Sequence, residues 1–206
     1  MNDPPPPLTL VIDTATAACS TALIEAGEMV DERHEIVGRG HAERLMPMIE
    51  ALLDGRRPGA ILVDCGPGSF TGVRVGLAAA HGLRIGWQVP LSGYSSMTLV
   101  AAGVGGGPLG VALDGGHGQL FIQSFADDPL RPLDALRSLL IEEAAAAMTM
   151  ERVVGSGAAA LVAARGFGRA GEALPRAADA RLLPPPLSSL PPRPIYGRAP
   201  DARPMP

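Results

Sequence analysis

The chain has 206 residues, of which 47% are apolar and 18% charged, an ordinary globular composition that excludes extensive disorder. Its 17 basic residues other than histidine are all arginines, and the absence of lysine excludes Schiff-base chemistry and a Walker-type phosphate loop. A formal net charge of −4, with no arginine cluster along the sequence, indicates that any contact with nucleic acid requires a partner.

The start of the chain has neither the basic residues nor the apolar stretch of a secretory signal, because Met1–Asp3 are followed directly by prolines. No later segment approaches the roughly 18 uninterrupted apolar residues of a membrane span. We therefore expect a cytoplasmic protein without membrane association. Cys19 and Cys65 each lie in an apolar run, which favours buried free thiols over a disulfide.

The first part of the chain predicts elements in the order strand, strand, strand, helix, strand, helix. Turn residues at Thr14–Thr16 and Glu25–Gly27 separate the first three strands, and Asp54–Gly55 ends the first helix. This order is that of a ribonuclease-H-like layer and predicts a mixed sheet with helices on its faces. The expected strands are Leu8–Asp13, Cys19–Ile24, Met29–Ile36 and Ala60–Cys65, and the expected helices are His41–Leu53 and a segment ending near Gly86.

The pattern restarts at Val89, so two related halves are expected, residues 8–88 and a smaller, shortened half over residues 89–206. From Pro184 the chain is too rich in proline for a helix or a central strand, and we expect this tail to lie extended over the surface. The expected elements are a short strand at Val89, helices Ser95–Ala102 and Ala158–Arg165, and strands Leu109–Leu113, Gln119–Phe125 and Arg152–Gly155.

Two loops could hold an anion. Segment Asp13–Ser20 places an acidic residue before small hydroxyl residues, a turn that cradles ATP phosphates in actin-like folds but that also forms when such side chains bond their own backbone. In GPGSFTG, Gly66–Gly72, Thr71 is the expected helix cap, and the loop is either an anion site or a tight strand-to-helix turn. The candidate residues of this vestigial nucleotide or anion loop are Asp13, Thr14, Thr16, Gly66, Gly68, Ser69 and Thr71.

The helix expected after this loop, Val73–Ile85, is apolar around most of its circumference, which is typical of a helix covered on two sides. One side should face the sheet, and the other is covered either by the chain itself or by a partner. Gly72, Gly76 and Ala80 form a stripe of small residues that would let another helix approach closely. We favour a partner interface, because exposed apolar surface tends to mark binding sites.

No constellation for catalysis or metal binding is evident. The histidines at positions 34, 41, 81 and 117 include no pair three or four residues apart, the spacing that helical metal ligands require. A GxSxG nucleophile elbow is absent, and Asp114 before two glycines is more typical of a hairpin turn than of a catalytic loop. We therefore expect no catalytic residue and no metal site.

Several stretches together resemble the TsaB (YeaZ) family, which serves the synthesis of threonylcarbamoyladenosine in tRNA. They are IDTATAACSTAL (12–23), HAERLMPMIEALL (41–53), GPGSFTGVRVGLAAAHGL (66–83), PLSGYSSM (90–97) and PIYGR (194–198). The resemblance is good over about residues 8–100 and patchy beyond, and the GPGSFTG block is its most specific part. It implies an α/β fold of the actin-like, Hsp70-like kind, with two related halves whose mixed sheets are flanked by helices.

The resemblance further implies a non-catalytic subunit that docks and activates the catalytic paralogue TsaD, with the ATPase TsaE as another partner. Their complex modifies the adenosine beside the anticodon of ANN-reading tRNAs. The chain would need no cofactor of its own, would meet ATP and tRNA only in the complex, and could form a homodimer when alone. Partner-binding helices of the family map onto 41–53 and 72–85, with interface residues expected at Arg44, Leu45, Met48, Arg74, Ala78 and His81.

The sequence differs from the catalytic paralogue in one place and departs from the family in two. Only His41 remains of the paralogue's paired metal-binding histidines, so neither the metal site nor catalysis is carried over. Gly115-Gly116 replaces an acidic-basic pair, which leaves that loop without a predicted role. Pro184–Pro186 stands where a helix is expected after Ala177–Leu183, so the second half should be less complete.

Two other functions compete with the subunit. A small independent ATPase or kinase would use Asp13, Thr14, Thr16 and the loop Gly66–Gly72, and would lose nucleotide when these are altered. A metalloprotease, the older label of the superfamily, is opposed by the missing histidine pair. The first alternative stays open at this point.

Overall fold

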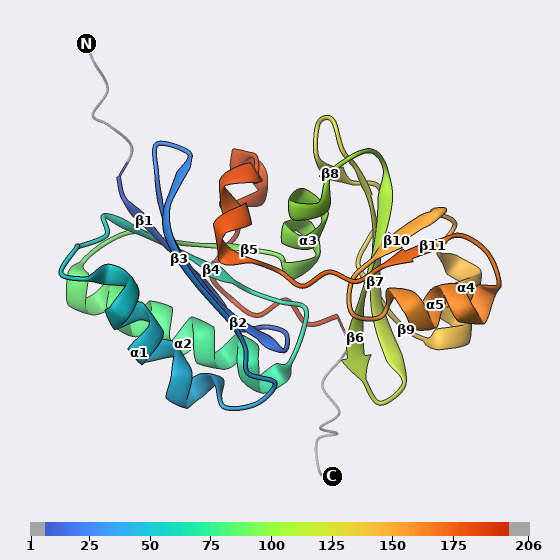
Figure 1. Ribbon diagram of the computed structural model, residues 1–206, viewed down its shortest axis with the longest axis horizontal. Coiled ribbons are helices and arrows are strands. Elements are labelled where there is room, and N and C mark those ends of the chain that lie inside the picture. The colour runs from blue at the N-terminus through green and yellow to red at the C-terminus, as the bar shows by residue number, and fades with distance from the viewer. Residues whose placement is uncertain (1–6, 198–206) are drawn as a thin grey trace, which may run out of the picture.

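The computed structural model describes residues 7–197 and places them in two sheets that lie side by side, each flanked by helices (Figure 1). The start of the proline leader, Arg198 of the PIYGR stretch and the end of the tail lie outside the described residues. Residues 7–197 contain no helix with the length and hydropathy of a membrane span.

The N-terminal sheet has five strands in the order β3-β2-β1-β4-β5. The first three form antiparallel hairpins, and β4 and β5 run parallel to β1, as the predicted element order requires. Because β1 and β4 are parallel neighbours, their carboxyl ends lie next to each other. The strands are β1 (Thr9–Asp13), β2 (Ala18–Glu25), β3 (Glu28–Ile36), β4 (Ala60–Asp64) and β5 (Leu91–Tyr94).

Helices α1 (His41–Leu53) and α2 (Phe70–Trp87) cover one face of this sheet (Figure 1). Side chains alternate along a strand, so β1 sends every second residue to these helices. The resulting core packs Leu10 and Ile12 of β1 against the buried faces of both helices. Both helices begin and end within about three residues of the positions that the sequence predicted.

The opposite face of the sheet is covered by α3 (Ser96–Val104) and by a 3-10 helix near the end of the chain, η1 (Ala177–Leu182). The core there joins Val11 and Leu62 of the sheet to Ala177 and Leu183. The N-terminal half therefore reaches beyond residue 88, where the sequence placed the boundary, because it contains β5 and needs a segment from the far end of the chain to bury its second apolar face.

The C-terminal sheet has the order β11-β10-β6-β7-β8, and β9 pairs residues 119–122 of β7, whereas β8 pairs residues 125 and 126. Helices α4 and α5 pack on one face and α3 on the other, so α3 lies between the two sheets. Strands β6, β7 and β10 and helix α5 match the prediction. The elements are β6 (Leu109–Gly116), β7 (Gln119–Ala126), β8 (Arg131–Pro132), β9 (Arg137–Leu140), α4 (Ile141–Ala147), β10 (Arg152–Val154), α5 (Ala158–Arg165) and β11 (Arg169–Gly171).

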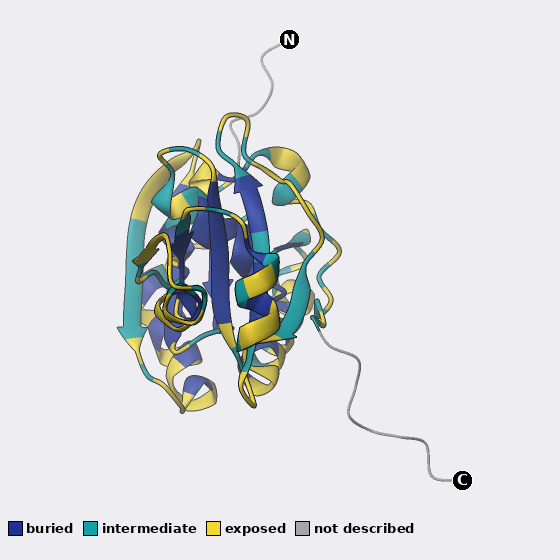
Figure 2. Cartoon of the chain, turned by 90° about the vertical axis from the view of Figure 1, so that its right-hand side faces the viewer, coloured by how far each residue is buried: buried dark blue, intermediate teal, exposed yellow. Residues whose placement is uncertain are grey.

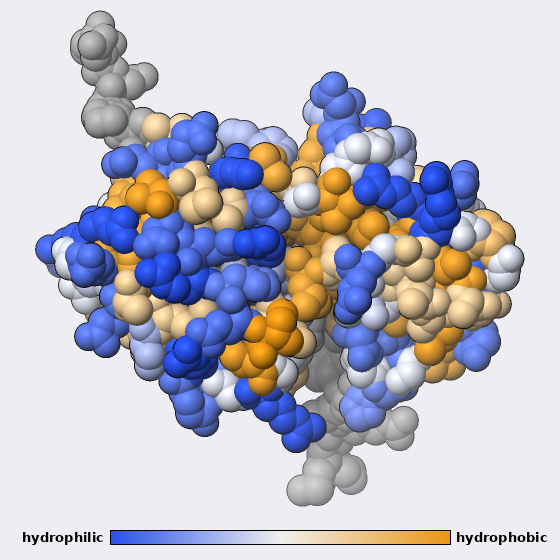
Figure 3. Space-filling view, viewed as in Figure 1, coloured by the Kyte–Doolittle hydropathy of each residue, from blue (hydrophilic) through white to orange (hydrophobic). Residues whose placement is uncertain are grey.

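The proline-rich segment begins with a short 3-10 helix, η2 (Pro185–Leu187), where the sequence predicted no helix. From there to residue 197 the described part of the tail runs extended over the surface, as predicted (Figure 1). Residues 190–197, which we name the strap, run along the β5 edge of the N-terminal sheet. Leu190 and Gly93 exchange backbone hydrogen bonds of 2.7 and 2.9 Å, and the Ile195 N–H donates to the Cys65 carbonyl at 2.7 Å. Figure 2 shows that the central strands are buried and that exposed residues lie on outer elements and loops. In the space-filling view of Figure 3, apolar side chains gather on the surface between the two halves of the molecule.

The fold makes a prediction about two glycines of α2. A Cβ on Gly72 would lie 2.0 Å from the Thr14 carbonyl oxygen, whereas a Cβ on Gly82 would meet nothing within 4 Å. Gly72→Ala should therefore lower the free energy of unfolding by about 1–3 kcal/mol or more, as overpacking does. Gly82→Ala should raise it by about 0.5–1 kcal/mol, because alanine favours the helix. Urea unfolding of both variants checks this, and similar effects at both positions would contradict it.

Candidate functional site

Two buried carboxyl groups lie side by side at the centre of the N-terminal half. Asp13 ends β1 and Asp64 ends the parallel neighbour β4, and their exposed fractions are 0% and 2%. In open α/β sheets, ligands bind in the crevice beyond the carboxyl ends of the strands. This position is therefore where a functional site is expected.

Neighbouring groups satisfy both carboxyl groups. The Tyr94 hydroxyl lies 3.0 Å from Asp13 Oδ2 and 3.2 Å from the Ile12 carbonyl oxygen, and donates its one proton between them. Ser96 donates to Asp64 Oδ2 at 2.7 Å, and the Gly66 N–H donates to Asp64 Oδ1 at 2.7 Å. The pair is thus held by β5, by the start of α3 and by the loop after β4.

The two carboxyl groups share a proton. Burial, reinforced by the negative charge of Asp13, holds the pKa of Asp64 well above its ordinary value. Burial also raises the pKa of Asp13, while the hydrogen bond from Asp64 acts in the opposite direction. Asp64 is therefore the protonated member and donates to Asp13. The pair then carries a single negative charge. Because the pair is buried and its oxygens accept hydrogen bonds from neighbouring groups, this charge is closed to a cation from solvent.

The loop Gly66–Gly72 is closed by the turn that follows β1. The Ser69 N–H donates to the Ala15 carbonyl at 2.6 Å, and the Thr14 hydroxyl donates to the Gly72 carbonyl at 2.7 Å. A Cβ on Gly68 would lie 2.1 Å from the Ala15 carbonyl oxygen, so glycine is required there for contact between backbones. Thr16 caps its own turn by accepting from the Ala18 N–H. The structure brings the predicted loop residues together, but they bind one another.

The sequence assigned the cap of the second helix to the wrong residue. Helix α2 begins at Phe70, and Ser69 is its N-cap, with its Oγ accepting from the Gly72 N–H at 3.2 Å. Thr71 lies inside the first turn and is exposed. Sequence reasoning also missed Tyr94 and Ser96 as members of the buried network. The stretch PLSGYSSM drew attention to them only through the family resemblance.

The small-residue stripe on α2 does not face a partner. Gly72, Gly76 and Ala80 are buried, and a Cβ on Gly76 would lie 2.5 Å from Thr14 Oγ1, so the stripe packs against the chain's own hairpin turn. The expectation that it serves helix-to-helix association is therefore wrong. The small residues are needed because the turn after β1 lies directly beneath the helix.

The six expected interface residues fall into two groups. Leu45 and Met48 lie on the buried side of α1 and belong to the core, so we remove them from the expected interface. The other four reach the surface to different extents. Arg44 pairs with Glu35 at 2.6 Å, Arg74 donates to the Tyr196 hydroxyl at 3.1 Å, His81 lies 3.2 Å from the Pro192 carbonyl, and Ala78 is exposed.

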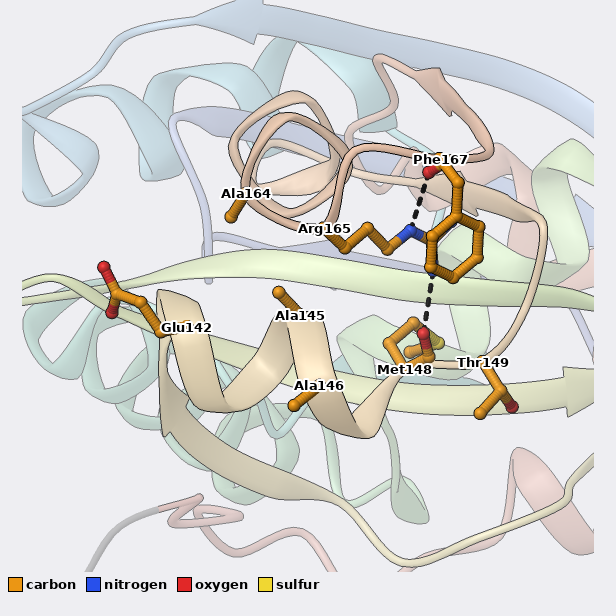
Figure 4. A pocket seen from close by; sticks show the side chains of 8 residues that line it. All are labelled: Glu142, Ala145, Ala146, Met148, Thr149, Ala164, Arg165 and Phe167. Atoms are coloured by element: carbon orange, nitrogen blue, oxygen red, sulfur yellow. Dashed lines mark hydrogen bonds between the residues drawn. The ribbon is translucent and has the colours of Figure 1, made fainter.

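A shallow depression of about 420 Å³ lies between α4 and α5 (Figure 4). Arg165 crosses it, with Nη1 donating to the Met148 carbonyl at 2.8 Å and Nε to the Phe167 carbonyl at 2.9 Å. The guanidinium is thus committed to backbone carbonyls, and much of the remaining lining is alanine. Among residues 7–197, no three histidine, cysteine, aspartate or glutamate side chains are grouped to hold a metal. The acid pair remains the candidate site.

The shared proton predicts a pH dependence. The native state keeps a proton on Asp64 that the unfolded chain releases above about pH 4, so wild-type stability falls as the pH rises from there toward the folded pKa. In Asp64→Asn the amide donates to Asp13 without a proton equilibrium. This variant should gain stability relative to wild type between pH 5 and pH 8 in urea unfolding.

Asp64→Ala is the matched control for this measurement. It leaves the Gly66 N–H and the Ser96 hydroxyl without their acceptor, and should cost about 1–3 kcal/mol at pH 5. An Asp64→Asn protein that loses stability relative to wild type as the pH rises would contradict the shared proton.

Two solved structures from Pseudomonas aeruginosa share this fold over nearly the whole chain. One, described as an uncharacterized protein with similarity to peptidase YeaZ, has a TM-score of 0.78 at 26% identity and covers 93% of this chain and 99% of its own. The other, described as YeaZ, has a TM-score of 0.76 at 25% identity and covers 91% of this chain and 98% of its own. The predicted α/β architecture of two sheets flanked by helices is confirmed.

Sequence relatives lead to the same family. The Escherichia coli K12 protein TsaB is 42% identical over 101 residues, which are 46% of this chain and 42% of TsaB. TsaB of Bacillus subtilis 168 is 33% identical over 98 residues, 45% of this chain and 43% of the relative, so each match spans less than half of the relative's length. A family model described as TsaD, tRNA N6-adenosine threonylcarbamoyltransferase, matches residues 29–166. The chain therefore belongs to the TsaB (YeaZ) family, within the wider group that the TsaD model describes.

Proposed function

We propose that the chain is a non-catalytic subunit of the machinery that modifies the adenosine beside the anticodon of ANN-reading tRNAs, where it docks and activates the catalytic subunit TsaD. The observation that carries this proposal is the closed crevice at the ends of β1 and β4. Thr14 and Ala15 fill the space over the loop, and the acid pair is buried, with its hydrogen bonds made within the chain. Because the crevice is closed, the outer surface of the chain is the part that remains to contact a partner.

The outer side of the helix layer offers such a surface. Ile85 of α2 is 76% exposed, and Met46 of the neighbouring helix α1 is 45% exposed. Ala78, two turns before Ile85 on α2, is exposed and small, so a partner helix can approach there. Large exposed apolar side chains on neighbouring helices are typical of a protein interface. TsaE and ATP would bind only to the assembled complex.

The docking proposal predicts the effect of one charge. Ala78→Glu places a carboxylate in the centre of the exposed helix face, where desolvation on docking would be costly. Mixed with the TsaD of the same organism, wild type should form a heterodimer in sedimentation velocity, and Ala78→Glu should weaken it by at least about tenfold. The matched control is Ala160→Glu, an exposed alanine of α5 in the other half, which should bind as wild type does. If wild type forms no complex, the proposal fails.

The independent ATPase or kinase is tested on the chain alone. Because Asp13 and Thr14 are buried and bonded within the chain, we expect calorimetric titration of the isolated protein with Mg-ATP to give no saturable binding. Saturable binding that Asp13→Asn abolishes would favour the alternative. Activity of a metal-free preparation would separately exclude a metalloprotease.

A further inference from the structure

The strap and the first turns of α2 build one exposed cluster of two aromatic rings and a guanidinium. The Arg74 guanidinium carbon lies 3.2 Å from the centroid of the Phe70 ring, and Arg74 Nη2 donates to the Tyr196 hydroxyl at 3.1 Å. The Phe70 and Tyr196 rings are 6.5 Å apart with an angle of 36° between their planes. We name these three residues the aromatic-arginine platform.

The platform is open to solvent and carries positive charge. Phe70 is 62% exposed, Tyr196 is 55% exposed, and Arg74 is exposed. The strap adds the exposed Arg193, and neither α2 nor the strap contains an aspartate or glutamate. None of the ion pairs among the described residues involves Arg74 or Arg193. Both guanidinium groups are therefore available to phosphate groups.

We propose that the aromatic-arginine platform binds single-stranded RNA, namely the unpaired anticodon loop of the tRNA substrate; this inference rests on the proposed function. Unstacked bases bind to aromatic rings and to the plane of a guanidinium, and phosphates bind to arginines. Too few cations are present for tight binding by the chain alone. The contact therefore forms when the complex supplies the remaining affinity.

Charge distinguishes the platform from the protein-docking face. Charged residues are depleted in the core of a protein interface, and the apolar stretch around Ala78 and Ile85 fits such a core. The platform lies at the other end of α2, where the helix dipole adds positive potential. Docking along α2 would leave the platform at the rim of the interface, from which it can reach RNA held by the partner.

The strap fixes the geometry of the platform before any ligand arrives. Tyr196 directly follows Ile195, whose N–H is bonded to Cys65, and precedes Gly197, where a Cβ would lie 2.5 Å from Phe121 of β7. The backbone on either side of Tyr196 is thus held against the N-terminal half and the C-terminal half, and the hydrogen bond from Arg74 orients the ring. A rigid ring loses little conformational entropy when a base stacks on it.

The test uses the full chain with the TsaD and TsaE of its own organism. Complex formation is measured first by sedimentation, and then a fluorescent anticodon stem-loop of an ANN-reading tRNA is titrated by anisotropy between about 50 and 200 mM salt. Arg74→Gln should raise the Kd about fivefold or more and lower the salt slope by about one. Phe70→Leu should raise the Kd similarly and leave the slope unchanged. Arg131→Gln, the same change on exposed β8, is the matched control.

The outcomes separate the inference from the proposed function. Thermal melting confirms that each variant folds. If Arg74→Gln and Phe70→Leu bind RNA as the Arg131→Gln control does, the inference is overturned. If the two variants no longer bind TsaD, the platform is a protein contact. The RNA inference is then overturned, whereas the proposed function stands. If wild type forms no complex, the proposed function fails. The RNA inference is then tested by titrating the chain alone with the stem-loop. It stands if Arg74→Gln weakens RNA binding more than Arg131→Gln does, and it is overturned if the two variants bind RNA equally.

Discussion

The rest of the N-terminal half depends on one buried proton. Two carboxylates that are both removed from water cannot both be ionised, so Asp13 and Asp64 share a hydrogen. Each also accepts a bond from a neighbouring element, with Tyr94 on β5 bonding Asp13 and Ser96 at the start of α3 bonding Asp64. The pair therefore fixes the relative positions of two sheet strands, a third strand and a helix.

Closure of the crevice follows from the same geometry. With the ends of β1 and β4 held together, the turn after β1 lies against the loop after β4, and the glycines of that loop permit contact between their backbones. A loop whose N–H and hydroxyl groups bond within the chain has little left to offer a phosphate. In the function that we propose, contacts on the outer surface of α1 and α2 take the place of chemistry in this crevice.

Much of the fold could be predicted from the sequence because apolar periodicity and turn residues are local signals. Helices α1 and α5 begin and end at the residues that the sequence predicted. Other features depend on contacts between distant residues. The role of Asp64 follows only from the parallel pairing of β1 with β4, and Ala177 covers the N-terminal sheet only because the chain returns to it. Short, weakly patterned elements such as β8 gave no periodic signal.

Helix α2 shows why composition alone could not assign its faces. Its glycines and alanines suggested a partner interface. On the face toward the sheet, however, position 76 must be glycine, because the Thr14 side chain lies too close for a Cβ there. On the outer side, exposed apolar residues remain, and the strap, which no local pattern placed there, adds Tyr196 beside Arg74. One helix thus seals the crevice with its inner face and exposes apolar and aromatic side chains on its outer face. Because both faces belong to one rigid element, closing the crevice also fixes the position of the surface that a partner would meet.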